Sequence, residues 1–380
     1  QLAGRVADYS TVGTVYSYNV GGSFFPSPDV RLRAQYSRSQ RAPTLTEFFS
    51  PPRGDYDSLT DPCGGLLPDG SGITPPPGSN ASAATIAANC LAEPGIQAYF
   101  ADPDNAGQAF SSGSSVYGPN AGNQNLNEET ADTFTAGVIF TPRFIPGLSL
   151  IIDYYQITVN DAIGSVSTQL AAELCYTADN YPNNRFCDTI TRNPATGDVR
   201  EVINQAENLD SYKTSGIDTT FNYDWEIGGV PGDFDFNVIY THYLEDSYTF
   251  QAIDGPQTED TLGIIGNPKD EFRAKLGWQH DGLRLSWTTL FKSGGVDDKD
   301  VKPTDPGYYS IGSQAYHSIY ASYTLRNRPT IRLYAGVSNL FNDLGPFLPS
   351  GLDNGGSRNI TSSLNDLDGR EFYMGARFAF

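Results

Sequence analysis

The sequence predicts an all-β protein, a transmembrane antiparallel up-and-down β-barrel, on three observations. Apolar and polar side chains alternate along a dozen segments, as in strands with one apolar face. Short turns and long loops alternate between these segments. No run of about 18 apolar residues occurs, so no transmembrane helix is predicted. A barrel strand needs no such run, because only every second side chain meets lipid.

The alternation is clearest in the last segment. Phe372, Met374 and Phe378 fall on one face there, and Arg377 falls on the other. Arg and Lys within strands are then expected to face a wet interior, since at mid-bilayer each would cost roughly 2–4 kcal/mol on the lipid face. The predicted strands are residues 1–9, 13–25, 30–40, 128–141, 147–162, 209–226, 233–248, 267–280, 283–294, 312–325, 330–341 and 369–380.

Aromatic residues near strand ends suit the two girdles that barrels place at the membrane interfaces. Ordinary aromatic residues of a strand core are the alternative reading. The girdle candidates are Tyr16, Tyr18, Tyr154, Tyr155, Trp225, Trp278 and Trp287.

The connections fall into two kinds. The short ones are residues 26–29, 142–146, 227–232, 280–282 and 326–329. The long ones are residues 41–127, 163–208, 249–266, 295–311 and 342–368, with a tight exception at 10–12. Outer-membrane barrels have short periplasmic turns and long extracellular loops, so 41–127 and 163–208 are predicted to be extracellular. A soluble β-sandwich is the alternative, but it has less reason to collect long loops at one end.

The two longest loops each contain a pair of cysteines close in sequence. An even count with local spacing suits disulfides formed outside the cytoplasm, and we expect both loops to be ordered caps. Four free thiols or a metal site are the alternatives, although no His lies near either pair. A short helix is predicted at 168–176. The expected bonds are Cys63–Cys90 and Cys175–Cys187.

Composition and motifs exclude several functions. A net charge of −20 argues against nucleic acid as a partner, because phosphate binding needs clustered Lys and Arg. No Gly-x-Ser-x-Gly elbow or phosphate loop appears, and His242, His280 and His317 are far apart, so no enzyme, cofactor or catalytic residue is predicted. The acidic stretches 102–105 and 297–300 lack the full ligand set of an EF-hand. They are interpreted as solvated loops, and no metal site is predicted.

Four short segments, spread in order over almost the whole chain, resemble the TonB-dependent receptor family. RAPTLTEFF at 41–49 is similar to the family's Arg-Ala-Pro-x-x-x-Glu-Leu-Phe segment, and NLNEETAD at 125–132 is similar to its Asn-x-x-Leu-x-Pro-Glu-x-Ser stretch. GVSNLFN at 336–342 and the ending DGREFYMGARFAF at 368–380 continue the likeness.

The resemblance implies a 22-stranded barrel plugged by an N-terminal domain. Residues 1–380 would then be roughly its last twelve strands, with the plug outside this chain. An open half-sheet would leave two unpaired edges in lipid, so we expect the other strands and the plug in the full protein. The alternative is a self-contained twelve-stranded pore or autotransporter translocator.

The resemblance also implies function. Such receptors sit in the outer membrane of Gram-negative bacteria and take up a ferric siderophore, cobalamin, haem or an oligosaccharide, driven by the TonB complex acting through the plug. Expected partners are therefore the TonB complex, outer-membrane lipid and a small-molecule ligand. A surface scaffold without transport is the alternative.

Candidate site residues follow from these expectations. Aromatic faces stack on sugars or catecholates, so the expected ligand contacts are Tyr99, Phe100, Phe110 and Tyr117. Arginines of the lumen would supply counter-charge to an anionic ligand or, as the preferred interpretation, face the plug. These are Arg31, Arg33, Arg273 and Arg332.

Overall fold

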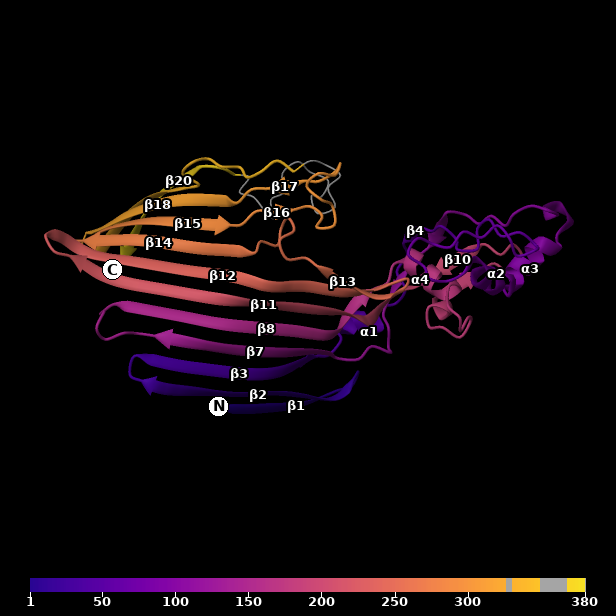
Figure 1. The fold of residues 1–380 in the computed structure, drawn as a ribbon, viewed down its shortest axis with the longest axis horizontal. Helices are drawn as coiled ribbons and strands as arrows, with labels where there is room; N and C mark the ends of the chain where they lie inside the picture. Colours follow the sequence, from indigo (N-terminus) through magenta and orange to yellow (C-terminus); the bar gives the residue numbers. More distant parts are fainter. Residues whose placement is uncertain (326–329, 349–367, 380) are drawn as a thin grey trace.

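One large antiparallel sheet dominates the computed structural model, which describes residues 1–325, 330–348 and 368–379 (Figure 1). Twelve strands follow one another in it in chain order, each paired antiparallel with its neighbours. They are β1 (Leu2–Tyr9), β2 (Gly13–Ser27), β3 (Val30–Arg41), β7 (Glu129–Phe140), β8 (Leu148–Ser165), β11 (Asn204–Ile227), β12 (Val230–Ala252), β14 (Asp270–His280), β15 (Leu283–Lys292), β18 (Gln314–Leu325), β19 (Thr330–Ser338) and β20 (Glu371–Ala379).

All twelve predicted strands are confirmed, with their ends shifted by a few residues. Three predictions fall outside the described residues: the turn at 326–329, most of the loop at 342–368, and the place of Phe380 on the last strand. Smaller strands extend the sheet at its loop end, where β13 (Gly255–Asp260) pairs with β12 and β6 (Asn120–Ala121) pairs with β11. The strands β16 (Gly295–Val296) and β17 (Ser310–Ile311) form a separate two-stranded sheet, and Val296 also makes a single bridge to Ile264.

The pairing register divides the sheet into an apolar face and a polar face. Trp278 lies opposite both Phe234 and Leu285, and the next row, two residues along, brings Leu276 opposite Trp287. These side chains share one face because successive side chains of a strand point to opposite sides. Leu276 is 46% exposed and Trp287 39% exposed, so the chain leaves this face uncovered. An uncovered apolar face of this extent suits contact with hydrocarbon.

Among the described residues, no helix is long and apolar enough to cross a membrane.

Aromatic rings gather on the apolar face near both ends of the strands. Toward the short turns Trp225 stacks on Tyr223 and Phe234, with ring centroids 5.1 and 5.5 Å apart. Toward the long loops Phe272 stacks on Phe291 at 4.9 Å. The positions of these rings in the pairing register are thus compatible with the two expected aromatic girdles.

One girdle candidate is wrong. Tyr155 follows Tyr154 directly, so the two rings point to opposite faces. Tyr155 lies on the polar face opposite Gly216, where a Cβ on that glycine would lie 2.7 Å from the Tyr155 hydroxyl. Period-2 geometry excludes two consecutive residues from one girdle.

The two longest loops fold together into one unit beyond the end of the sheet, hereafter the loop domain, residues 42–127 and 166–203 (Figure 1). Its small sheet, in the order β4-β5-β10-β9, takes two strands from each loop. The predicted helix at 168–176 is confirmed as α4. The elements of the loop domain are α1 (Leu45–Phe49), β4 (Tyr56–Ser58), α2 (Ala83–Leu91), α3 (Pro94–Ala101), η1 (Pro103–Asn105), β5 (Ser115–Tyr117), β6, α4 (Thr168–Tyr176), η2 (Cys187–Thr189), β9 (Ile190–Arg192) and β10 (Val199–Val202).

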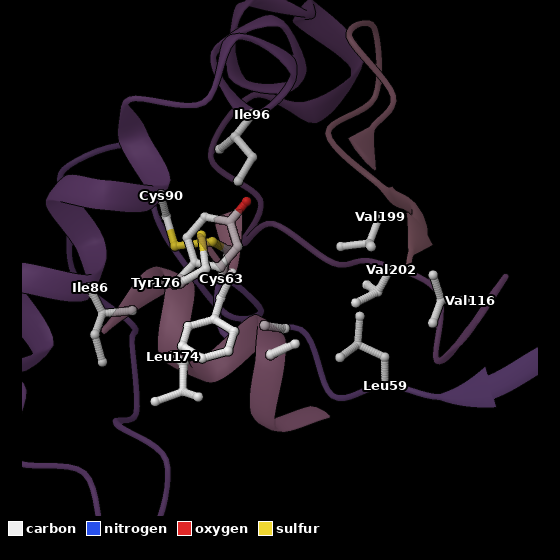
Figure 2. Packing of buried hydrophobic residues seen from close by; sticks show 14 of the residues in the cluster. Leu59, Cys63, Ile86, Cys90, Ile96, Val116, Leu174, Tyr176, Val199 and Val202 are labelled. Atoms are coloured by element: carbon white, nitrogen blue, oxygen red, sulfur yellow. A yellow bond between two sulfur atoms is a disulfide. The ribbon is translucent and has the colours of Figure 1, made fainter. Parts of the chain in front are cut away.

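The loop domain contains a hydrophobic core of its own. Ile86 and Ile96 are fully buried beside the ring of Tyr176, which is 1% exposed (Figure 2). Both predicted disulfides, Cys63–Cys90 and Cys175–Cys187, are present, and the first lies within this core. The expectation of ordered caps is therefore met.

Two neighbouring isoleucines of β8 provide a test of the two faces. Ile152 lies opposite Val138 on the apolar face, and Ile151 lies opposite Ile139 on the polar face. We expect Ile152→Arg to destabilise the folded barrel by roughly 2–4 kcal/mol, because the charge would enter the apolar band. Ile151→Arg, the matched control, is expected to cost about 0–1 kcal/mol. Denaturant titration of the full-length protein in lipid vesicles measures both, and equal costs would contradict the assignment of the faces.

Candidate functional site

The polar face is built around ion pairs that cross a strand over a glycine. Arg33 of β3 and Asp153 of β8 both lie opposite Gly137 of the intervening β7. The Arg33 Nε donates to Asp153 Oδ1 at 2.9 Å. A Cβ on Gly137 would lie 1.8 Å from that carboxylate oxygen, so glycine is required for the two side chains to meet.

A related ion pair lies farther along the sheet, although there only the carboxylate residue lies opposite the glycine. Arg284 of β15 pairs with Asp235 of β12 at 2.9 Å, and the carboxylate lies over Gly277 of β14. A Cβ on that glycine would lie 2.2 Å from Asp235 Oδ1. A glycine on the strand between two charged residues thus leaves room for them to form an ion pair on the polar face.

A hollow of about 670 Å³ lies over the polar face between β2 and β11. Its charged lining comprises Arg31, Arg33, Asp153 and Asp218. Arg31 donates to the Ser23 hydroxyl at 3.0 Å and lies 5.4 Å from the centroid of the Phe25 ring.

The four arginines expected in the lumen all lie on the polar face by register. The hollow brings together Arg31 and Arg33 but not Arg273 and Arg332. Arg332 donates to the hydroxyls of Tyr320 and Ser322 at 3.2 and 3.1 Å instead.

An arginine links the sheet to the loop domain, in addition to the pairing of β6 with β11. Arg41, at the end of β3, donates to Glu129 of β7 at 2.7 Å and to Glu47 of α1 at 3.0 Å. Thr44 and Glu47 form a capping box that begins α1. Burial would raise the pKa of Glu47, but the Arg41 guanidinium and Thr44 hold that pKa below its ordinary value. Two of the short segments that carry the family resemblance therefore meet in one salt-bridge cluster.

A buried ion pair joins the two halves of the loop domain. Arg192 of β9 contacts Asp61 through both terminal nitrogens at 2.6 Å, and the two side chains are 4% and 3% exposed. Arg192 Nε also donates to the Tyr176 hydroxyl at 2.7 Å, and its guanidinium lies 4.7 Å from the centroid of that ring. The bidentate contact with Asp61 and the hydrogen bond to Tyr176 offset the free-energy cost of burying the Arg192 charge.

Two tyrosines continue this network to the first loop. The hydroxyls of Tyr176 and Tyr181 donate to Glu93 Oε1 at 2.7 and 2.6 Å. Burial raises the pKa of both phenols, so both remain protonated donors. Each bond joins residues that are more than 80 positions apart in sequence.

The expected aromatic contacts are only partly brought together. Tyr99 packs edge-on against Phe100 and Phe110 at 5.5 and 5.2 Å. Phe110 is 1% exposed, so its ring belongs to the core and supports Tyr99. Tyr117 lies apart, on β5. Contact of Tyr99, Phe100 and Tyr117 with a ligand stays a prediction.

Sequence analysis missed a set of exposed apolar side chains at the base of the loop domain. Leu45 and Phe49 of α1 are 73% and 53% exposed, and Tyr56 of β4 is 74% exposed. Tyr56 stands 5.6 Å from Tyr117, ring centroid to ring centroid. We call Phe49, Tyr56 and Tyr117, together with Leu45 one turn before Phe49 on α1, the aromatic strip. Of these four, the sequence analysis named only Tyr117, because the exposure of the others depends on how the loops fold.

Two of the histidines and one of the acidic stretches make hydrogen bonds within the fold. His242 pairs with Asp270 at 2.7 Å, and His317 lies 3.0 Å from the Thr289 hydroxyl oxygen. Asp102 accepts the Asp104 amide as the cap of η1. Within the described ranges, no three His, Cys, Asp or Glu side chains are placed to hold a metal ion.

Comparison with known proteins gives one family. Residues 1–340 match the sequence model of the family described as TonB dependent receptor-like, beta-barrel. No curated protein sequence matches the chain.

Solved structures show the same fold. One is a mutant of the ferric enterobactin receptor PfeA from Pseudomonas aeruginosa in complex with enterobactin, 16% identical, with a TM-score of 0.58 over 98% of this chain and 41% of that chain. Another is the siderophore receptor PirA from Acinetobacter baumannii, 14% identical, with a TM-score of 0.56 over 100% of this chain and 43% of that chain. This chain thus spans about two fifths of the length of these structures.

The buried ion pair of the loop domain is testable by substitution. Arg192→Leu leaves the Asp61 carboxylate buried and unpaired, which is expected to cost about 3–5 kcal/mol of loop-domain stability. Hydrogen exchange of peptides spanning 59–66 and 190–202 in the full-length protein reports this opening. The double variant Asp61→Leu/Arg192→Leu is expected to recover much of the loss, because it buries no lone charge.

The matched control is Arg143→Leu, which removes an ion pair with Asp29 whose arginine side chain is 72% exposed. We expect about 0–1 kcal/mol there. Unchanged exchange in Arg192→Leu, or an equal change in the control, would show that the buried pair does not hold the two loops together.

Proposed function

Because the chain belongs to the TonB-dependent receptor-like β-barrel family, we propose that it forms the C-terminal part of an outer-membrane receptor that imports a ferric siderophore in a TonB-dependent way. The family is one of receptors and transporters of the Gram-negative outer membrane. The siderophore is proposed because the similar solved structures include a ferric enterobactin receptor and a siderophore receptor. Cobalamin, haem and oligosaccharides are the alternative ligands.

One observation carries this proposal: a folded loop domain stands at one end of a sheet with one apolar and one charged face (Figure 1). The apolar face suits hydrocarbon, and the neutralised ion pairs of the polar face suit a wet interior. A ligand caught at the loop domain would then pass into the hollow that Arg31 and Arg33 line. The TonB complex would act through a plug domain outside this chain.

The aromatic strip supports capture of a ligand with planar rings. Three of its members are more than half exposed although apolar, and such exposed patches mark binding surfaces. Helix α1 lies beside the strand ends, at the base of the loop domain (Figure 1), so its exposed side chains stand where a ligand would pass from the loop domain to the sheet. Catecholate rings stack on tyrosine and phenylalanine faces. We propose that the strip supplies the first contacts.

The edge strands weigh against a self-contained twelve-stranded pore. A closed barrel of these strands needs β1 to pair with β20. In the described part of the chain, β1 pairs with β2 and β20 with β19, and no pairing joins the two edges. Two open edges are untenable in hydrocarbon, so we propose that further strands of the receptor complete the barrel.

Uptake measurements test the proposed function. The full-length receptor is expressed in a Gram-negative host that lacks its own ferric siderophore receptors, with and without TonB, and uptake of radioactive iron as a ferric catecholate is followed. Accumulation only in the presence of TonB is expected. Equal accumulation without TonB would indicate a passive pore, and surface binding without accumulation would indicate a scaffold.

Substitution of the most exposed ring tests the aromatic strip. An aromatic stack contributes about 0.5–1.5 kcal/mol, so Tyr56→Ala is expected to raise the Kd of the purified full-length receptor for a ferric tris-catecholate by up to about tenfold. Fluorescence titration measures the Kd. The control is Phe144→Ala, an equally exposed ring (73%) in the turn at the opposite end of the sheet. A Kd that Tyr56→Ala leaves unchanged removes the strip from the ligand site.

A further inference from the structure

A depression of about 690 Å³ opens on the apolar face between β12 and β20. Its floor is made by two small side chains, Ala321 of β18 and Ala335 of β19, which lie opposite each other. Leu285 lies opposite Ala321 on one side, and Met374 lies opposite Ala335 on the other. A row of large side chains is thus interrupted at its centre.

The next row toward the loop end closes the depression. Trp287 lies opposite Ile319, and Val337 lies opposite Phe372. All four line the depression. The walls are therefore apolar on three sides, and the floor is two methyl groups and backbone.

The two indole N–H groups at its rim are already hydrogen-bonded. The Trp287 Nε1 donates to the Thr289 hydroxyl at 3.1 Å, and the Trp278 Nε1 donates to the Pro231 carbonyl at 3.1 Å. Neither indole therefore has an N–H left to bind a polar ligand within the depression. Its occupant must be recognised by shape and apolar contact.

We propose that the depression binds one acyl chain of a membrane lipid. The proposal rests on the placement of the apolar face in the membrane under the proposed function. Water gains no hydrogen bonds against such walls, and an empty space would forfeit dispersion contacts. An acyl chain lying on Ala321 and Ala335 contacts protein on three sides, whereas on the flat apolar face it contacts protein on one side. This lipid is held longer than its neighbours.

Filling the floor tests the proposal. The full-length receptor is purified in detergent, and a phosphatidylethanolamine with brominated acyl chains is titrated into the mixed micelles. Bromine quenches tryptophan fluorescence at short range, and Trp278 and Trp287 line the site. We expect quenching that saturates at one lipid per receptor. Ala335→Phe is expected to lose this saturable component and keep only quenching proportional to the lipid fraction.

The matched control is Ala136→Phe. Ala136 of β7 also faces an alanine of the neighbouring strand, Ala34, on the same apolar face, but it lies outside the depression. The saturable component is expected to persist there. The proposal is overturned if Ala335→Phe quenches like the unsubstituted receptor, or if both variants lose the component.

Native mass spectrometry of the same samples gives a second readout. A lipid adduct is expected on the unsubstituted receptor and on Ala136→Phe, and its loss is expected in Ala335→Phe. A receptor dimer that Ala335→Phe separates, with no adduct, would identify a second copy as the occupant and overturn the lipid assignment. Siderophore uptake measured in parallel separates the two proposals, because uptake can fail while the adduct persists.

Discussion

Pairing of backbone polar groups in a medium without water is the constraint on which this structure depends. Hydrocarbon offers no partner to an N–H or C=O group, so a membrane sheet must satisfy each of them through its neighbouring strands. Continuous antiparallel pairing then sets the side-chain period at two. That period places Ile152 on the apolar face and Ile151 on the polar face, and it brings Arg33 and Asp153 together on the polar face.

The loop domain must be stabilised in another way, because it lies beyond the end of the sheet and cannot bury its apolar side chains against the apolar face of the sheet. It therefore builds a core of its own from two loops that are distant in sequence. Hydrophobic burial around Tyr176 is reinforced by two disulfides and by the Arg192–Asp61 pair, which together constrain a long connection. Small units of this kind commonly need such additional bonds. The chain thus combines two modes of stabilisation, continuous strand pairing in the large sheet and a hydrophobic core in the loop domain. The salt bridges of Arg41 and the pairing of β6 with β11 connect the two.

The sequence predicted what is local and periodic, and missed what is long-range. Strand positions, the helix at 168–176 and both disulfides depend on short spacings, and all are confirmed. The packing of the two loops against each other was not predictable, because no sequence pattern near Asp61 indicates that it pairs with Arg192. Phe110 illustrates the same gap for the site: its ring was expected at a surface and lies in the core. Tyr56 was not predicted as a site residue and is exposed, because the exposure of its ring depends on neighbours that only the folded loops supply.

The charges on the polar face determine whether an anionic ligand would be attracted to it. The chain has a net charge of −20, and Arg33, Arg41 and Arg284 each neutralise a carboxylate. Paired guanidinium groups offer little to an anionic ligand, because their charge is already satisfied. Arg31 differs, since its contacts are the neutral Ser23 hydroxyl and the Phe25 ring. Under the proposed function, the initial attraction would come from apolar and aromatic surface, and Arg31 would supply a counter-charge deeper along the path.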